Sequence, residues 1–159
     1  MGLDMYLTAE RYLWGSGDNT DKDVKAAIQK MMPETAGMEV KTVSIEAMYW
    51  RKANAIHKWF VDTLQEGVDE CQTTRLEWDS LVQLRALCQS VLADHSIAPD
   101  VLPAGGGFFF GNTEYDEWYF DTLERTVEGI DRIENQLVAE TDRSGVPYSQ
   151  WEFKYQSSW

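Results

Sequence analysis

The C-terminal residues 151–159 constrain the fold most, because aromatic and polar side chains alternate along them. The aromatic positions are Trp151, Phe153, Tyr155 and Trp159. The polar positions between them are Glu152, Lys154, Gln156 and Ser158. Successive side chains of a β-strand point to opposite faces, so this period of two predicts a strand with an aromatic inner face. The chain therefore has to build a sheet around this strand.

Further strands are expected in three other places. Residues 3–14 also alternate, and because both of their faces carry apolar side chains they predict a central strand. Residues 38–47 predict a second strand, with a change of phase between Val40 and Val43 that a β-bulge would explain. Residues 108–110 predict a short buried strand.

Helical periodicity and capping patterns predict four helices. They cover residues 24–31, residues 49–67, and the stretches that open with capping-box patterns at residues 74–77 and 113–116. Together with the strands they predict an α+β domain, with a small, largely antiparallel sheet of three to four strands and about four helices packed on one side. The 159 residues suit a single domain, 1–159.

The charge of the chain excludes several classes of partner. It has 27 Asp and Glu residues against 14 Lys and Arg residues, a formal net charge of -13. This field repels nucleic acids and anionic membrane surfaces, so any bound anion has to be small. No apolar run approaches the roughly 18 residues that cross a bilayer, no secretory signal is recognised, and Cys71 and Cys88 lack metal-binding spacing. We expect a soluble cytoplasmic protein with no metal and no cofactor.

Residues 49–60, YWRKANAIHKWF, interrupt the acidic pattern. They hold three cations, a histidine, an asparagine and four aromatic residues, without one acid. On a helix, Arg51, Asn54 and Lys58 recur at i, i+3 and i+7. The neighbouring ridge carries Trp50, Asn54 and His57.

These side chains suit a nucleotide. Arginine and lysine bind phosphate oxygens, asparagine reads a base edge, and tryptophan or histidine stacks on a ring. A plainer interpretation stays open, in which Trp50 and Trp59 belong to the core, His57 is a buried hydrogen-bonded histidine, and the cations balance neighbouring acids.

A second candidate stretch is residues 112–119, where a helix N-terminus coincides with Tyr115, Trp118 and Tyr119. The rings could sandwich a base, although the acids among them would repel a phosphate and would instead read the donor edge of a base or ribose hydroxyls. A capped helix start with aromatic core residues is the structural alternative. The predicted ligand-binding residues are Trp50, Arg51, Asn54, His57, Lys58, Tyr115 and Trp118, with no catalytic residue and no metal ligand.

Four stretches of the chain are distinctive in sequence: residues 1–7 (MGLDMYL), 49–57 (YWRKANAIH), 107–119 (GFFFGNTEYDEWY) and 155–159 (YQSSW). In these stretches the chain resembles a group of small, mostly uncharacterised proteins common in phage genomes and bacterial prophages. The resemblance implies a phage origin and action against host defences in the host cytoplasm. One such class consists of sponges that sequester cyclic nucleotide or cyclic ADP-ribose signals without cleaving them, usually as homo-oligomers.

Two other functions stay open. Residues 114–140 hold nine acids and only two arginines, which is typical of an acidic interaction protein or DNA mimic that inhibits a host protein. A small phosphodiesterase would use His57 as a base, oriented by Asp116 or Glu117. No familiar nucleophile or metal motif is present, so the sequence favours binding over catalysis.

Overall fold

The computed structural model describes residues 2–14, 19–107, 110–138, 140–141 and 147–159. Its main sheet has four antiparallel strands in the order β2-β1-β6-β3. These strands are β1 (Asp4–Tyr12), β2 (Thr42–Arg51), β3 (Thr74–Leu76) and β6 (Glu152–Ser158). A separate two-stranded sheet joins β4 (Glu140–Thr141) to β5 (Pro147–Tyr148). The predicted α+β class is confirmed.

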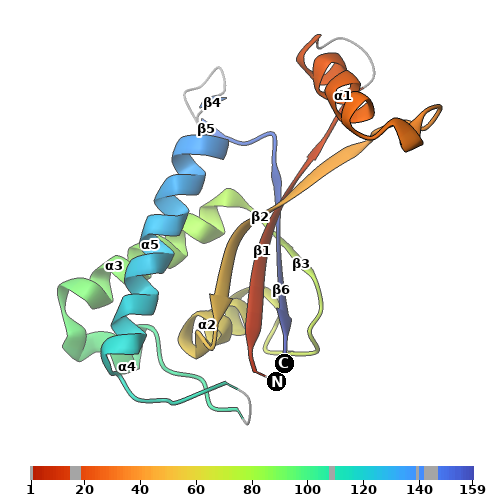
Figure 1. The fold of residues 1–159 in the computed structure, drawn as a ribbon. Helices are drawn as coiled ribbons and strands as arrows, with labels where there is room; N and C mark the ends of the chain where they lie inside the picture. Colours follow the sequence, from red (N-terminus) through yellow and green to blue (C-terminus); the bar gives the residue numbers. More distant parts are fainter. Residues whose placement is uncertain (1, 15–18, 108–109, 139, 142–146) are drawn as a thin grey trace.

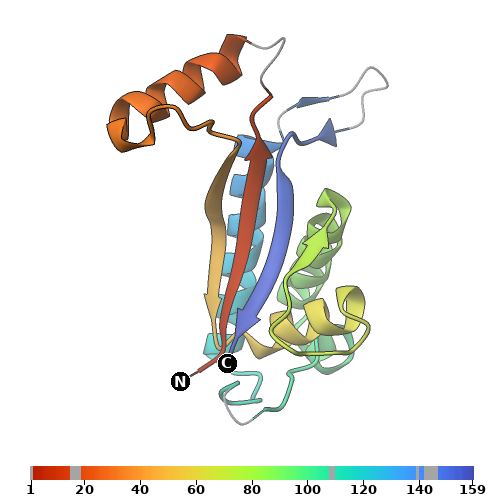
Figure 2. The same cartoon turned by 90° about the vertical axis from the view of Figure 1, so that its right-hand side faces the viewer.

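Five α-helices and two short 3-10 helices are present in the described part of the chain. They are α1 (Asn19–Met31), η1 (Pro33–Thr35), α2 (Asn54–Leu64), α3 (Trp78–Ala93), η2 (His95–Ile97), α4 (Ala98–Val101) and α5 (Glu117–Leu137). Helices α2, α3 and α5 cover one face of the main sheet, while α1 projects beyond the end of the strands (Figures 1 and 2). None of the described helices is long and apolar enough to cross a membrane.

The two strands with the clearest alternation lie side by side in the middle of the sheet. In β1, Met5, Leu7 and Ala9 are fully buried, and the residues between them are half-buried. In β6, Tyr155 lies opposite Leu7 and Phe153 lies opposite Ala9. Both strands therefore turn their apolar faces toward the helices, as their period of two predicts.

Helix α2 contributes the central aromatic contact of the core. Phe60 is fully buried and stacks on Tyr155, with ring centroids 3.9 Å apart and an angle of 9° between the planes. Trp50 of β2 meets Phe60 edge to face at 5.9 Å. Helix α5 reaches β2 closely at Gly129, where a Cβ would lie 2.1 Å from the Met48 methyl carbon. The missing side chain thus makes room for Met48.

The helix predicted to start at Tyr49 begins later in the structure. Tyr49 lies in β2 and pairs with Tyr6 of β1. The turn comes at Lys52, whose φ is 54° and whose N–H donates to the carbonyl of Leu3 at 2.8 Å. Helix α2 starts only after this turn. The prediction was wrong because the same residues fit a helical period, and packing against β1 decides between the two structures.

Three smaller predictions also need correction. The β2 bulge lies beside Met48, not between Val40 and Val43. Residues 74–77, predicted as a helix cap, mostly form β3 because they pair with β6. The last helix starts later than its predicted capping box, at α5, where Asp116 accepts a hydrogen bond from the backbone N–H of Tyr119 at 3.1 Å. Most of the strand predicted at residues 108–110 lies outside the described residues.

The two cysteines differ in their surroundings, and this predicts different reactivity. Cys88 of α3 is fully buried, and burial raises the pKa of its thiol to about 12, whereas Cys71 is half-buried. Because only the thiolate reacts, we expect Cys88 to react with a chromogenic disulfide at pH 8 roughly a thousandfold more slowly than an ordinary thiol. A native-state titration should show one fast thiol, which Cys71→Ser removes. Two fast thiols would contradict this expectation.

Candidate functional site

Two adjoining cavities lie against α5, one between α5 and β2 and the other between α5 and the start of α2, and together we call them the groove. The first, of about 340 Å³, is the arginine cavity; its walls are residues 48–51 and Ala53 on one side and Trp118, Thr122, Arg125, Glu128, Gly129 and Arg132 of α5 on the other. The second, of about 170 Å³, is the amide pocket, lined by residues 52–56, Gly111, Asn112, Glu114, Asp116, Trp118, Tyr119, Thr122 and Leu123. Ala53, Trp118 and Thr122 line both.

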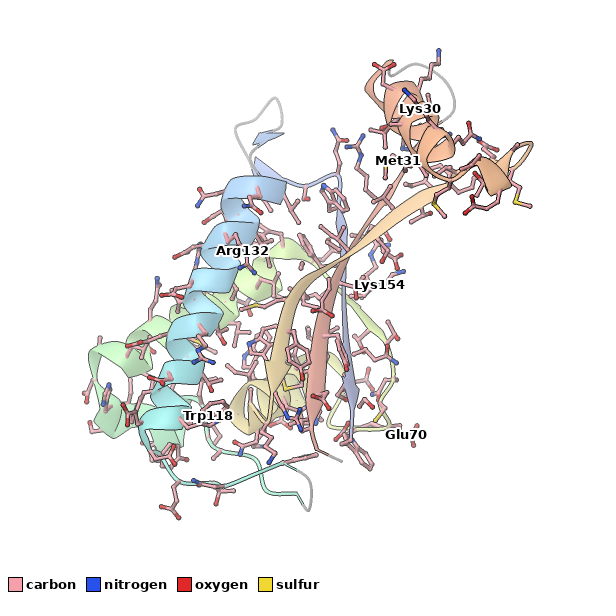
Figure 3. All side chains as sticks on the ribbon, in the orientation of Figure 1. Lys30, Met31, Glu70, Trp118, Arg132 and Lys154 are labelled. Atoms are coloured by element: carbon pink, nitrogen blue, oxygen red, sulfur yellow. The ribbon has the colours of Figure 1, made fainter. Side chains whose placement is uncertain are left out.

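Three guanidinium groups line the arginine cavity. Arg51 is the last residue of β2, and Arg125 and Arg132 lie on α5. Since Trp118, Arg125 and Arg132 follow each other at intervals of seven residues, they share one face of the helix. Figure 3 labels Trp118 and Arg132 along this helix. Arg132 donates to the carbonyl of Ala47 at 3.1 Å.

Arg51 and Arg125 form no ion pair with any residue that the structure describes. Among the described residues, no carboxylate lies within 4.0 Å of either guanidinium. Some of the other cations do have such partners: Arg75 lies 3.4 Å from Glu152 and Arg85 lies 2.7 Å from Asp131. The arginine cavity is therefore a local concentration of unpaired positive charge, with Glu128 as its one lining acid.

Trp118 gives the groove an accessible ring. Its side chain is 51% exposed although it lies where both cavities meet. The Arg125 guanidinium lies over this indole, 5.7 Å from the ring centroid, in a cation–π contact. This contact holds a cation and an aromatic surface beside each other at the wall of the groove.

The amide pocket is shaped by Asn54, which is buried. Its side-chain amide donates to the carbonyl of Asn112 at 2.7 Å and to that of Phe110 at 3.3 Å. These bonds fasten the segment before α5 to the start of α2. The Asn112 amide donates in turn to Asp116 at 2.7 Å, whereas no partner of the Glu114 carboxylate is present among the described residues. Glu114 is thus the acid of this pocket that a ligand can reach.

His57 lies away from the groove. It is 1% exposed, its Nδ1 lies 2.7 Å from the Tyr155 hydroxyl, and its Nε2 lies 2.9 Å from a carboxylate oxygen of Asp69. The acid beside the ring is therefore Asp69, not Asp116 or Glu117 as the enzymatic alternative required. Both ring nitrogens already have partners within the protein.

The remaining predicted residues divide between core and surface. Trp50 is 5% exposed and its indole N–H donates to the Thr126 hydroxyl at 2.9 Å, although its side chain also lines the arginine cavity. Lys58 pairs with Asp62 at 2.6 Å, one helical turn away. The Tyr115 hydroxyl accepts a hydrogen bond from the backbone N–H of Ala104 at 3.3 Å.

The structure brings four of the seven predicted site residues together at the groove: Trp50, Arg51, Asn54 and Trp118. It does not bring His57, Lys58 or Tyr115 there. Sequence reasoning missed Arg125 and Arg132. The available signal was their spacing of seven from Trp118 and from each other, within a stretch where nearly all other charges are acidic.

No family model, curated protein or solved structure matches this chain. What the groove can do therefore follows from its own side chains. Arg51 and Arg125 can each donate two parallel hydrogen bonds to phosphate or carboxylate oxygens. The Trp118 ring can stack on a flat group, and Glu114 can accept hydrogen bonds from a base edge or from ribose hydroxyls. Among the described residues, no cluster of three or more His, Cys, Asp or Glu side chains is placed to hold a metal ion.

Proposed function

We propose that the groove binds a small anionic nucleotide and sequesters it without cleaving it. One observation carries the proposal: the unpaired guanidiniums of Arg51 and Arg125 line the same cavity as the exposed ring of Trp118, in a chain with a net charge of -13. Two cations in one cavity repel each other, and an anion between them would remove that cost. The phosphate would meet the arginines, and the base or ribose would extend toward the amide pocket.

The size of the ligand is limited by the charge of the whole protein. A long polyanion would meet the repulsive field of the acidic surface, whereas a mononucleotide or a small cyclic nucleotide meets mainly the groove. The resemblance to phage and prophage proteins supports a further step. It suggests that the ligand is a host defence signal of the cyclic nucleotide or cyclic ADP-ribose type, and that the protein acts against that defence.

Isothermal titration calorimetry with a ligand panel tests this function. The panel contains cyclic mononucleotides, cyclic dinucleotides, cyclic ADP-ribose, linear mononucleotides and inorganic phosphate. We expect at least one nucleotide to bind more tightly than about 1 µM, and phosphate alone to bind far more weakly. Ligand released by denaturation should have its original mass. Converted ligand would support an enzyme, and no binding across the panel up to roughly 1 mM would contradict the proposal.

The variant Trp118→Ala tests whether the nucleotide base stacks on the Trp118 ring. Loss of base–aromatic stacking costs about 1–3 kcal/mol, so affinity for the bound nucleotide should fall roughly 5- to 150-fold, while Trp118→Phe should keep part of it. Calorimetry measures both variants. Trp14→Ala is the matched control, because Trp14 is 67% exposed and lies outside the groove. Equal losses in Trp118→Ala and Trp14→Ala would mean that Trp118 does not touch the ligand.

The alternative function, an acidic interaction protein or DNA mimic, would use the acidic surface of α5. Part of its acidic surface is used within the protein, because Asp131 and Glu134 both accept hydrogen bonds from Arg85 of α3. Glu117, Glu124 and Glu128 stay exposed. A DNA mimic would retain a basic host protein from lysate in a salt-sensitive manner, whereas a nucleotide sponge would not. The arginines on the same helix favour the sponge.

A further inference from the structure

Residues 19–41 form a projection that we call the arm. It contains α1 and η1 and extends beyond the end of the main sheet, away from α2, α3 and α5 (Figures 1 and 2). None of its residues belongs to the buried core or to the half-buried apolar residues packed against that core. The arm therefore receives no support from the helices that stabilise the rest of the fold.

The contacts of the arm are local. Gln29 donates its amide to the carbonyl of Met38 at 2.7 Å, and Lys25 lies 3.3 Å from Glu39, so one face of α1 rests on the returning segment. Asp21 pairs with Arg11 near the base of the arm. On the opposite face of α1, residues 23, 26, 27, 30 and 31 are exposed.

A helix in this situation lacks the usual source of stability. The 13 residues of α1 extend about 20 Å, and an isolated helix of that length is marginal in water, because most helices are stabilised by packing an apolar face. The arm instead exposes three methionines: Met31 is 80%, Met38 66% and Met32 44% exposed. Flexible methionine side chains commonly form adaptable binding surfaces.

The exposed face of α1 is complementary to itself. Asp23, Ala27, Lys30 and Met31 are all exposed and recur at helical spacing on one face. In an antiparallel pair of α1 helices related by a two-fold axis between Ala26 and Ala27, Asp23 of each copy lies opposite Lys30 of the other. The small side chain of Ala27 lets the helices approach, and their dipoles run in opposite directions. Figure 3 labels Lys30 and Met31 on this arm.

The charge of the arm also indicates which partner binds the exposed face of α1. The arm has four lysines and four acids, so it is neutral within a chain of net charge -13. Two copies can meet through their arms without bringing their acidic bodies together, whereas an anionic membrane surface is repelled by the rest of the molecule. We propose that a second copy of this chain docks on α1, with the two α1 helices antiparallel and Asp23 of each copy paired with Lys30 of the other.

A charge swap tests this pairing by sedimentation velocity at protein concentrations of roughly 1–100 µM. Wild type should be a dimer. Asp23→Lys and Lys30→Asp each place like charges opposite each other, so each should raise the dimer dissociation constant at least about tenfold. The double variant Asp23→Lys/Lys30→Asp should restore it to within roughly threefold of wild type, since it has the same composition and the reversed pair. Lys22→Asp, on another face of α1, is the matched control and should leave the dimer unchanged.

The outcomes separate clearly. A monomeric wild type, single variants that dimerise like wild type, or a double variant weaker than both single variants would each overturn the proposal. Circular dichroism confirms that each variant is folded, and Ala27→Arg, which inserts a long side chain beside the two-fold axis, should give a folded monomer. Sedimentation velocity distinguishes monomer from dimer without any ligand, so the result is independent of whether the groove binds a nucleotide.

Discussion

Replacing both Arg51 and Arg125 with alanine is expected to lower affinity for the bound nucleotide at least about a hundredfold. A hydrogen bond to a charged group contributes about 1.5–3 kcal/mol, and each arginine can donate two such bonds to a phosphate. Each single replacement should therefore cost roughly tenfold or more, by the relation of 1.4 kcal/mol per factor of ten. Calorimetry with the ligand found in the panel measures the change directly.

The fold should be unaffected by the same replacement. Neither guanidinium has a carboxylate partner among the described residues, so their removal leaves no acid unpaired. The midpoint of thermal unfolding without ligand should stay within a few degrees of wild type.

Two further variants make the arginine result specific. Arg75→Ala is the control, because Arg75 is an exposed arginine of β3 whose partner is Glu152, and it should leave nucleotide affinity unchanged. Arg51→Lys keeps the charge but loses the planar pair of donors, so it should recover only part of the affinity. Wild-type affinity in the double alanine variant would remove the observation on which the proposed function rests.

The sequence predicted the sheet better than the turn that leads into the site. The strands β1 and β6 were both predicted from the alternation of their side chains, and they pair with each other in the middle of the sheet. Residues 49–51 fit a helical pattern and a strand pattern equally well. Their pairing with β1 depends on a partner more than 40 residues away, which local periodicity does not contain. Arg51 therefore lies at the end of β2 and not, as the sequence had predicted, on a helix.

The groove itself was partly visible in the sequence. Arg51 and Trp118 were singled out for their chemistry, but they lie on different elements, and only the packing of α5 beside β2 brings them to one cavity. Arg125 and Arg132 were counted as minor exceptions in an acidic helix. Their spacing of seven residues from Trp118 and from each other places them on one helical face, and this spacing distinguishes them from the acidic residues of the same helix.

For His57 the sequence suggested a binding site, but the structure places it in the core. Its neighbours in sequence are cationic and aromatic, which favoured a site, but its own contacts are with Asp69 and Tyr155, from a connector and from β6. The Tyr155 ring is fully buried, and burial raises the pKa of its hydroxyl well above the usual value. The hydroxyl is therefore neutral at working pH and needs a hydrogen-bond partner in the core.

We accordingly expect His57→Ala to lower the free energy of unfolding by about 3–5 kcal/mol, because it leaves a cavity, an unpaired Tyr155 hydroxyl and an Asp69 carboxylate without its partner. Urea unfolding followed by linear extrapolation measures this loss. Tyr155→Phe removes one hydroxyl and keeps the ring that stacks on Phe60, so it should cost only about 1–2 kcal/mol.

The variant His57→Ala also shows whether His57 belongs to the core or to the ligand site. At a temperature where His57→Ala is still folded, its nucleotide affinity should equal that of wild type, because His57 does not line the groove. Arg51→Ala should give the reverse pattern, with lost affinity and retained stability. If His57→Ala instead lost affinity while its urea midpoint stayed unchanged, His57 would act on the ligand directly, and the binding site would have to lie on the Asp69 side of α2.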